Sequence, residues 1–236
     1  MSRMFSLVAE TWNPVTGCLH NCVYCWARRL AETKLRRVPR YREGFKPRLN
    51  GQEFKRRFKP NRLVFVSDMG DLFGEWVPDK WIWRVIERIE KFPETKFLFL
   101  TKNPKRYWDF GYPDNVILGV TLETNRCDGY DKISKAPEPC VRYHDARLLG
   151  VKGNPVMISV EPILDFDLDD FIHVIKMLEP DMVYIGYDNY GHRLPEPPLE
   201  KTLRLIQELE KFTTVYRKTI RKAWYEGPLQ RIGGHT

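Results

Sequence analysis

Short, nearly continuous hydrophobic runs alternate with amphipathic stretches along this chain. The runs are rich in β-branched and aromatic residues, as is typical of parallel strands that are covered on both faces. The predicted strands are residues 5–9, 63–67, 96–101, 116–121, 156–161, 182–186 and 214–217. Each run is short, and none approaches the roughly 18 apolar residues that a membrane-spanning helix needs.

The stretches between the strands show the periodicity of amphipathic helices. Pro78 can occupy the first position of one helix, whose apolar face consists of Trp81, Val85, Ile86 and Ile89. Residues 169–178 and 198–211 show the same pattern. A β–α order repeated about six times predicts an α/β fold, with a parallel sheet and right-handed crossovers that curl into a full or partial barrel. We predict a single domain over residues 1–236.

The chain has 236 residues, of which 42% are hydrophobic, so it can bury one substantial core. Arg3 and a few apolar residues stand near the start, but Glu10 interrupts this run. A signal peptide needs a longer apolar segment, and none is therefore predicted. Together these observations predict a cytoplasmic protein with no membrane partner.

Positive charge is concentrated in one segment. The chain has 39 Lys and Arg against 31 Asp and Glu, a formal net charge of +8. Residues 36–62 contain eleven of the basic residues and two glutamates, so the rest of the chain is nearly neutral. Three prolines, two glycines and the lack of a clear period predict an inserted basic loop. Its charges are interleaved with Tyr41, Phe45, Phe54 and Phe58.

This basic loop indicates an anionic partner. Basic groups neutralise phosphates and aromatic faces stack on bases, so single-stranded or looped nucleic acid is a candidate partner of residues 36–62. The densest basic group consists of Lys55, Arg56, Arg57 and Lys59. The alternative is a solvated loop whose aromatic rings pack on the barrel.

Three of the five cysteines lie within eight residues, spaced Cys18-x3-Cys22-x2-Cys25. In a chain without a leader, this pattern argues against a disulfide scaffold and for a metal or redox site. Thiolates grouped this closely suit one iron–sulfur cluster, in which each iron takes a sulfur ligand. Three cysteines leave the fourth iron of a four-iron cluster open, as a catalytic metal site requires for binding a substrate.

Two alternatives stay open for these cysteines. His20 could complete a structural zinc site, although it lies between Cys18 and Cys22 with one residue on each side, which is geometrically awkward. The three cysteines could also be unrelated. Cys127 and Cys140 are separated by twelve residues and do not form a second cluster motif. They are predicted to be core cysteines, and the alternative is an auxiliary site.

The spacing Cys18-x3-Cys22-x2-Cys25, with Tyr24 just before the last cysteine, resembles the signature of the radical S-adenosylmethionine (radical SAM) superfamily. Further segments resemble a phage-associated radical-SAM-like family of unassigned activity, over residues 11–186. These segments are Trp12-Asn13-Pro14, Asp71-Leu72-Phe73-Gly74, Leu100-Thr101-Lys102-Asn103-Pro104, Leu118-Gly119-Val120-Thr121 and Ser159-Val160-Glu161-Pro162. Neither resemblance identifies a substrate.

The resemblance implies a partial (β/α)6 barrel and two cofactors. Cys18, Cys22 and Cys25 would ligate three irons of a 4Fe-4S cluster, and the open iron would bind the amino and carboxylate groups of S-adenosylmethionine. One electron from an electron donor would then cleave the sulfonium bond, giving methionine and a 5′-deoxyadenosyl radical that abstracts hydrogen from a substrate. Tyr24 would lie near the adenine.

Polar residues follow several of the predicted strands, at the end where barrels of this kind carry their chemistry. By analogy with the superfamily, Ser67 and Asp68 would meet the amino group of S-adenosylmethionine. Thr121, Glu123 and Asn125 would meet its ribose and carboxylate. The superfamily usually has a Gly-Gly-Glu motif after the second strand. Here that motif is absent, and Ser67-Asp68-Met69-Gly70-Asp71 stands in its place.

Two other charged residues end predicted strands. Glu161 follows a buried strand, where a carboxylate is costly to bury without a partner, so we also assign it to the cofactor site. Lys102 could bind the substrate or the carboxylate of the cofactor, but we predict a solvated lysine before Asn103-Pro104. The sequence therefore supports a radical SAM enzyme with an unidentified substrate, for which nucleic acid or a nucleotide is a candidate. The alternative is a non-catalytic iron–sulfur or zinc protein that binds nucleic acid, and S-adenosylmethionine cleavage distinguishes the two.

Overall fold

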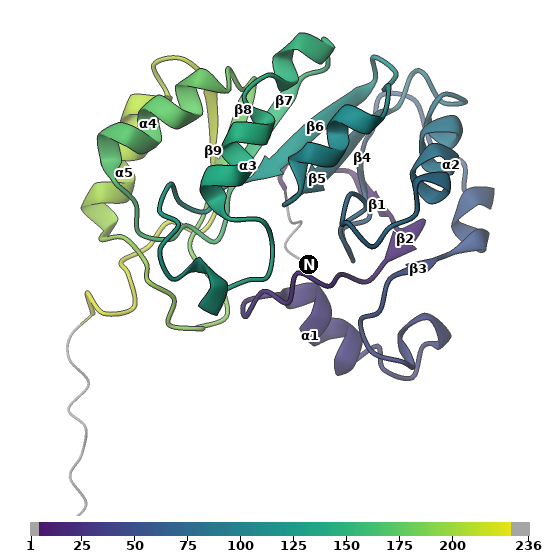
Figure 1. Ribbon diagram of the computed structural model, residues 1–236, viewed down its shortest axis with the longest axis horizontal. Helices are drawn as coiled ribbons and strands as arrows, with labels where there is room; N and C mark the ends of the chain where they lie inside the picture. Colours follow the sequence, from purple (N-terminus) through teal and green to yellow (C-terminus); the bar gives the residue numbers. More distant parts are fainter. Residues whose placement is uncertain (1–4, 228–236) are drawn as a thin grey trace, which may run out of the picture.

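The computed structural model describes residues 5–227 of the chain (Figure 1). Its centre is a seven-stranded sheet in the order β1-β4-β5-β6-β7-β8-β9, in which every neighbouring pair is parallel. The strands are β1 Glu10–Trp12, β4 Leu63–Val66, β5 Lys96–Thr101, β6 Val116–Thr121, β7 Val156–Val160, β8 Met182–Ile185 and β9 Thr214–Arg217. The sheet curls, with β1 and β9 at its two ends, into a partial barrel.

Helices cover the outer face of this sheet, and a smaller layer lies at its open end (Figure 1). The α-helices are α1 Trp26–Glu32, α2 Asp79–Ile89, α3 Pro139–Ala146, α4 Leu168–Met177 and α5 Leu199–Leu209. Strands β2 Val15–Thr16 and β3 Arg48–Leu49 pair antiparallel beside α1. Short 3-10 helices span Pro39–Tyr41, Gly51–Lys55, Pro104–Asp109, Tyr130–Lys132 and Leu149–Lys152. Within residues 5–227, no helix is both long enough and apolar enough to cross a membrane.

Side-chain alternation separates two cores. Successive residues of a strand point to opposite faces of the sheet. Val64 and Val66 of β4 therefore pack outwards with the helices, whereas Phe65 between them points into the barrel. The inner core consists of Phe5, Val8, Phe65, Leu98, Ile117, Met157 and Tyr184. This inner core fills the part of the barrel at the amino-terminal ends of the strands.

Six of the seven predicted strands are confirmed, and the one predicted at residues 5–9 is wrong. The first strand is β1, which begins at Glu10. Phe5 instead fills the barrel, with its ring centroid 5.5 Å from that of Phe65 and 4.7 Å from that of Tyr184. The apolar character of this segment comes from burial inside the barrel rather than from pairing in the sheet. The helices predicted near Pro78 and at 169–178 and 198–211 correspond to α2, α4 and α5.

The same alternation makes the carboxyl-terminal part of the barrel interior polar. On β5, Leu98 belongs to the inner core, Leu100 packs against that core, and Lys102 follows Leu100 two residues on. On β7, Met157 is followed at the same spacing by Ser159 and Glu161. The inner face thus changes from apolar to polar along each strand, which places polar side chains at the mouth of the barrel.

The filling of the barrel by Phe5 predicts a large effect on stability. Phe5 is 1% exposed, so Phe5→Ala removes a fully buried ring and leaves a cavity. We expect the free energy of unfolding to fall by about 3–5 kcal/mol in denaturant titrations followed by tryptophan fluorescence. The matched control is Leu7→Ala, whose side chain is 45% exposed and which should change stability by about 0.5 kcal/mol or less. Equal effects of the two substitutions would contradict this role of Phe5.

Candidate functional site

Cys18, Cys22 and Cys25 lie on the loop between β2 and α1, and all three are free and half-buried. Backbone hydrogen bonds hold this three-cysteine loop (residues 17–25) on its surroundings. The Gly17 N–H donates to the Met69 carbonyl at 2.8 Å, and the Cys18 N–H donates to the Phe45 carbonyl at 3.1 Å. The loop is therefore fixed at the carboxyl end of β4, next to the polar mouth of the barrel.

Glycine is required where this loop meets the turn after β4. Gly17 has φ +89°, and a Cβ atom there would lie 2.1 Å from the Lys46 carbonyl oxygen. Gly17 also forms an isolated parallel bridge with Gly70, where a Cβ atom would lie 2.8 Å from the Gly17 carbonyl oxygen. Since side chains are excluded from both positions, the two backbones approach closely.

The thiols of Cys18 and Cys25 are buried enough to disfavour their charged forms. Burial, followed by the charge of Asp71, raises the pKa of Cys18 well above its usual value. Burial likewise raises the pKa of Cys25, although the Arg28 N–H donates to its sulfur at 3.4 Å in the first turn of α1. A cation beside Cys18 or Cys25 would favour the thiolate, and the binding of a metal by these thiols would release protons.

His20 is held by a buried carboxylate. Its Nε2 lies 2.9 Å from Asp71 Oδ2, and both side chains are almost fully buried. Asp71 also accepts hydrogen bonds from the Thr101 hydroxyl at 2.7 Å and from the Lys102 N–H at 3.0 Å. This arrangement occupies one ring nitrogen of His20, which weakens its candidacy as a zinc ligand, and ties the loop to the ends of β4 and β5.

The most highly connected group at the mouth is the Glu123 carboxylate, whose side chain is 0% exposed. It pairs with Lys102 Nζ and, at 2.7 Å, with Arg142 Nη1. The hydroxyls of Tyr24 and Tyr130 also donate to it, the second at 2.9 Å. Burial opposes ionisation of Glu123, but Arg142 and Lys102 outweigh it and hold the pKa of this carboxyl well below its usual range.

The Glu123 network contains two residues that the sequence analysis missed. The prediction of a solvated Lys102 is wrong, because its side chain is only 13% exposed and is paired with Glu123. Arg142 of α3 was not predicted, and its side chain is 0% exposed. One signal was available for Lys102, since it continues the inward-facing positions of β5, whereas Arg142 joins the site only through tertiary packing.

The other residues assigned to the site divide into those at the mouth and one that points away. Ser67 and Thr121 are buried there, and Asp68 accepts a hydrogen bond from Asn13 Nδ2 at 2.6 Å. Glu161 pairs with Lys218, which supplies the partner that its burial requires. Asn125 instead binds the backbone of Asp167 and so fixes a loop. Its Nδ2 donates to the Asp167 carbonyl at 3.2 Å, and its Oδ1 accepts from the Asp167 N–H at 3.0 Å.

Two buried polar atoms near the mouth have no hydrogen-bond partner within residues 5–227. These are the Ser67 hydroxyl oxygen and Arg142 Nη2. Ser67 also has φ +59°, an uncommon conformation for serine. Buried polar groups are rarely left unpaired, and such groups are often completed by a ligand.

The aromatic residues of the basic segment 36–62 do not face solvent. Tyr41, Phe45 and Phe58 are buried, and Phe54 packs on Trp12 with ring centroids 5.9 Å apart. For these rings, the alternative in which they pack on the barrel is confirmed. They are not available to stack on bases, whereas several basic side chains of the segment, such as Arg36, Arg37 and Arg42, are exposed.

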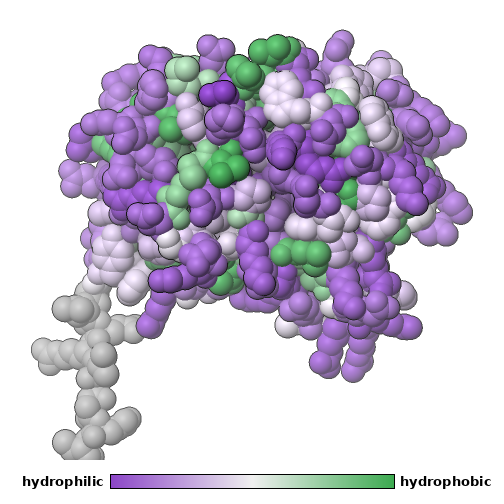
Figure 2. Space-filling model, in the orientation of Figure 1, coloured by the Kyte–Doolittle hydropathy of each residue, from purple (hydrophilic) through white to green (hydrophobic). Residues whose placement is uncertain are grey.

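The structure also divides this basic segment between two ends of the barrel. Tyr41 and Phe45 pack with α1 and Cys18, so residues 36–46 lie beside the three-cysteine loop. Residues 55–62 run along β1 to the amino-terminal edge, where the Lys96 N–H donates to the Arg62 carbonyl at 2.8 Å. The surface over α1 and the segment that follows it is strongly hydrophilic in Figure 2, at the lower edge of the view.

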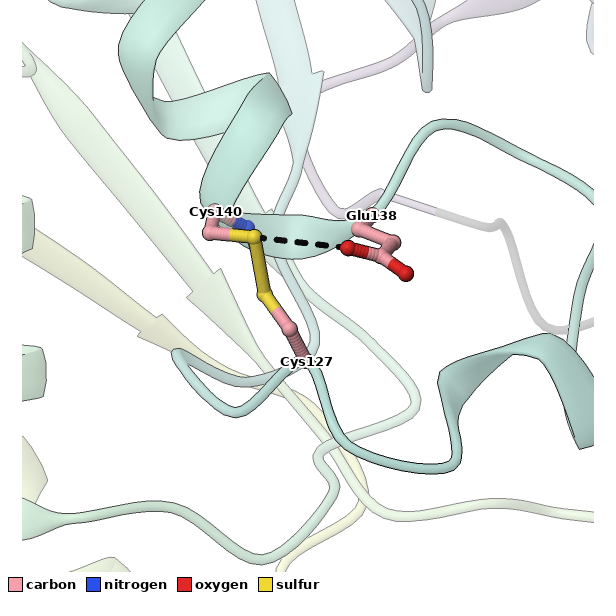
Figure 3. A group of neighbouring side chains, drawn as sticks. All are labelled: Cys127, Glu138 and Cys140. Carbon is pink, nitrogen blue, oxygen red and sulfur yellow. Dashed lines mark hydrogen bonds between the residues drawn. A yellow bond between two sulfur atoms is a disulfide. The ribbon is translucent and has the colours of Figure 1, made fainter.

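Cys127 and Cys140 form a disulfide in the structure, and Cys140 is exposed (Figure 3). The prediction of two core cysteines is therefore wrong. Sequence separation gave no sign of the pairing, because Cys127 lies in the loop after β6 and Cys140 in the first turn of α3. The fold brings both to the segment that covers the three-cysteine loop.

Residues 4–175 match the model of a family that is described as a protein of unknown function, DUF5131. The chain belongs to the DUF5131 family. The matched range includes the three-cysteine loop, the Glu123 network and the disulfide. A search of curated proteins found no match.

Solved structures share the fold of this DUF5131 chain at low sequence identity. A spore photoproduct lyase variant with bound S-adenosylmethionine and dinucleoside spore photoproduct has a TM-score of 0.57 and 14% identity, covering 86% of this chain and 61% of that chain. Streptococcus suis SuiB bound to S-adenosylmethionine has a TM-score of 0.53 and 12% identity, covering 90% of this chain and 48% of that chain. The DUF5131 chain therefore spans less than two thirds of either protein, and the likeness confirms the predicted α/β partial barrel.

The Glu123 network of the DUF5131 chain predicts a large and pH-dependent stabilisation. Glu123→Gln leaves Lys102 and Arg142 without their buried counter-charge, so we expect the free energy of unfolding to fall by about 3–5 kcal/mol near neutral pH. Because the folded pKa lies below the usual value of 4.5, this stabilisation is present above pH 4.5 and is lost as the pH falls further. Denaturant titrations of both proteins at several pH values measure the difference.

The matched control for this substitution is Glu208→Gln. Glu208 pairs with Lys211 at 2.6 Å, but the two side chains are 42% and 65% exposed. We expect a loss of about 1 kcal/mol or less. A Glu123→Gln effect no larger than that of the control would contradict the role assigned to the network.

Proposed function

We propose that this chain is a radical SAM enzyme. It holds a 4Fe-4S cluster on Cys18, Cys22 and Cys25, cleaves S-adenosylmethionine reductively to a 5′-deoxyadenosyl radical, and abstracts hydrogen from a substrate. The observation that carries the proposal is the placement of three free thiols on one loop at the polar mouth of a partial barrel. The two structures of similar fold described above each hold bound S-adenosylmethionine.

The spread of the three thiols favours a cluster over a single zinc ion. Tetrahedral zinc holds its sulfur ligands roughly 3.8 Å from one another, as follows from a Zn–S distance of about 2.3 Å. Among residues 5–227, the ligand atoms of Cys127, Glu138 and Cys140 lie within 4.8 Å of one another. The three thiols of the loop do not form such a group in that part of the chain. A four-iron cluster binds each cysteine at a different iron and so accepts a wider spacing.

Several residues at the mouth fit a bound S-adenosylmethionine. The unpaired Ser67 hydroxyl and the Asp68 carboxylate would bind its ammonium group, and Thr121 would bind its ribose. We assign Glu123 a different task from the one expected, because its oxygens already accept from four protein donors. It would hold Tyr24 beside the adenine and keep Lys102 charged.

Charge at the site supports binding of the anionic end of the cofactor. Burial alone would lower the pKa of Lys102, but the neighbouring Glu123 carboxylate outweighs it and raises this pKa. Lys102 and Arg142 together carry one more charge than Glu123 neutralises, so the network has a net positive charge. The cluster, when bound, supplies the electron for cleavage, which an external electron donor must replace after each turnover. Cytoplasmic location and phage association stay predictions.

Anaerobic reconstitution with iron and sulfide tests this proposal. We expect about four irons per chain, bound with sulfide through thiolates. The reduced protein with S-adenosylmethionine should release 5′-deoxyadenosine, slowly in the absence of substrate, as measured by chromatography. Cys18→Ala, Cys22→Ala and Cys25→Ala should each abolish this release, since each removes a cluster ligand.

The disulfide cysteines provide the matched control for these substitutions. The Cys127→Ala, Cys140→Ala double variant loses two cysteines outside the three-cysteine loop. It keeps the noncovalent contacts between residues 133–135 and that loop, so it should retain its iron. Stoichiometric zinc without sulfide in the wild type would overturn the cluster. A full cluster without any 5′-deoxyadenosine from reduced protein would favour the alternative, a non-catalytic cluster protein that binds nucleic acid.

The substrate proposed here is a nucleic acid or nucleotide, and exposed charge near the site supports this choice. Arg36, Arg37 and Arg42 are exposed, and none of them makes an ion pair in the part of the chain that the structure describes. They lie in the segment that packs against the three-cysteine loop. Phosphates approaching the mouth would therefore meet three free guanidinium groups, without help from base stacking by the buried aromatic residues.

Two triple substitutions within the basic segment test this surface. Changing Arg36, Arg37 and Arg42 to Ser should weaken single-stranded nucleic-acid binding. The slope of log affinity against log salt concentration should become shallower by about 0.7 for each phosphate contact that is lost. Changing Lys55, Arg57 and Lys59 to Ser removes the same amount of charge near the amino-terminal edge of the barrel. This variant should keep the affinity and the salt dependence of the wild type. Gel-shift titrations at two salt concentrations measure the effect. Equal binding by all three proteins, or no binding by the wild type, would remove nucleic acid from the proposal.

A further inference from the structure

The Cys127–Cys140 disulfide closes the segment of chain that covers the three-cysteine loop. Cys127 lies in the loop after β6, and Cys140 is the second residue of α3. Figure 3 shows the disulfide between them. The disulfide joins the two ends of residues 127–140, which we call the cap. No residue of this pair takes part in the Glu123 network, so the function proposed above does not account for it.

The middle of the cap contacts the three-cysteine loop directly. The Ser134 hydroxyl lies 3.1 Å from Cys22 Sγ. The Val23 N–H donates to the Ile133 carbonyl at 2.9 Å, and the Lys135 N–H donates to the His20 carbonyl at 2.6 Å. Cap residues thus contact Cys22, Val23 and the backbone of His20, and the geometry of the loop depends on where the cap lies.

The cap also reaches the buried charge at the mouth. Tyr130 is 2% exposed and donates its hydroxyl to Glu123 Oε1 at 2.9 Å. Burial, followed by the charge of Glu123, raises the pKa of Tyr130 to about 12, so it remains a donor at neutral pH. Displacement of the cap would therefore change both the three-cysteine loop and the Glu123 network.

We propose that Cys127 and Cys140 are a redox-active pair, which exchanges its disulfide with a dithiol reductant and thereby locks or releases the cap over the three-cysteine loop. The disulfide form holds the cap closed. The dithiol form leaves it attached by the noncovalent contacts described above. The pair is a site of reversible oxidation, and its partner is a small-molecule or protein dithiol.

The surroundings of the two sulfurs favour exchange at Cys140. Cys140 is exposed and Cys127 is half-buried, so an attacking thiolate reaches the Cys140 sulfur more readily. The leaving Cys127 thiolate would accept the Cys140 N–H, which lies 3.1 Å from Cys127 Sγ. The Glu138 carboxylate, 3.7 Å from Cys140 Sγ, repels an approaching anion and restrains the rate.

The exchange balances in two steps. The first thiolate of the dithiol bonds to Cys140 Sγ, the Cys127–Cys140 bond breaks, and Cys127 leaves as a thiolate. The second thiol of the reductant, as its thiolate, then attacks the reductant sulfur and releases Cys140 as a thiolate. Two electrons pass from the dithiol to the pair, the reductant becomes a disulfide, and both cysteines take up protons according to pH.

Hydrogen exchange of the full-length protein, followed by mass spectrometry, tests the proposal. Alkylation and peptide mapping would first establish, in graded dithiothreitol buffers, which state Cys127 and Cys140 occupy. Reduction should speed exchange of the Val23 and Lys135 amides by at least about tenfold. The upper bound is about a hundredfold, the effect of a cross-link that closes a loop of this length. These amides belong to the chain itself, so the result does not depend on cofactor cleavage.

Two variants assign the effect to this pair. In the double variant Cys127→Ser, Cys140→Ser, the Val23 and Lys135 amides should exchange at the fast rate in every buffer. In the triple variant Cys18→Ser, Cys22→Ser, Cys25→Ser, exchange of these amides should still become faster in dithiothreitol. Equal exchange in the oxidised and reduced wild type would overturn the proposal, as would the absence of a Cys127–Cys140 disulfide in any buffer. Tight binding of one zinc ion by the reduced pair, lost in Glu138→Gln, would also overturn it and assign the group to a metal.

Discussion

The burial of one carboxylate, Glu123, organises the mouth of the barrel. An ionised carboxylate without partners would be too costly to keep in this position, so the surrounding chain has to deliver cations and hydroxyls to it. Lys102 comes from the end of β5, Arg142 from α3, Tyr24 from the three-cysteine loop and Tyr130 from the cap. Four segments far apart in sequence are positioned by a single charge.

The same carboxylate helps to hold the three-cysteine loop in place. Tyr24 lies between Cys22 and Cys25, and its hydroxyl is committed to Glu123. His20 lies between Cys18 and Cys22, and its ring is committed to Asp71. The residues between the cysteines thus hold the backbone, which leaves the three thiols free to face a common ligand. Such preorganisation would reduce the entropy lost on binding of the proposed cofactors.

Much of the fold could be predicted from local patterns, because a parallel strand covered on both faces must be apolar throughout. Residues 96–101 and 116–121 carry this pattern clearly, and both match the observed strands. The segment that begins at Phe5 is also apolar, but Phe5 fills the barrel. Composition alone does not distinguish burial within a strand of the sheet from burial inside the barrel. The cysteine spacing predicts a metal or redox site for the same local reason, since the proposed ligands all lie in one short loop.

The parts that sequence reasoning missed depend on contacts between distant segments. Lys102 looks like an ordinary surface lysine until Glu123, 21 residues later, is brought beside it. Arg142 and the Cys127–Cys140 pair are positioned by the path of the chain after β6, which has no periodic pattern.

The close approach of Gly17 to Gly70 affects experiments that rank positions by their tolerance to substitution. Any side chain at either glycine displaces the loop, so a saturation screen would score both as severely as the cysteines, although neither carries a group that could react.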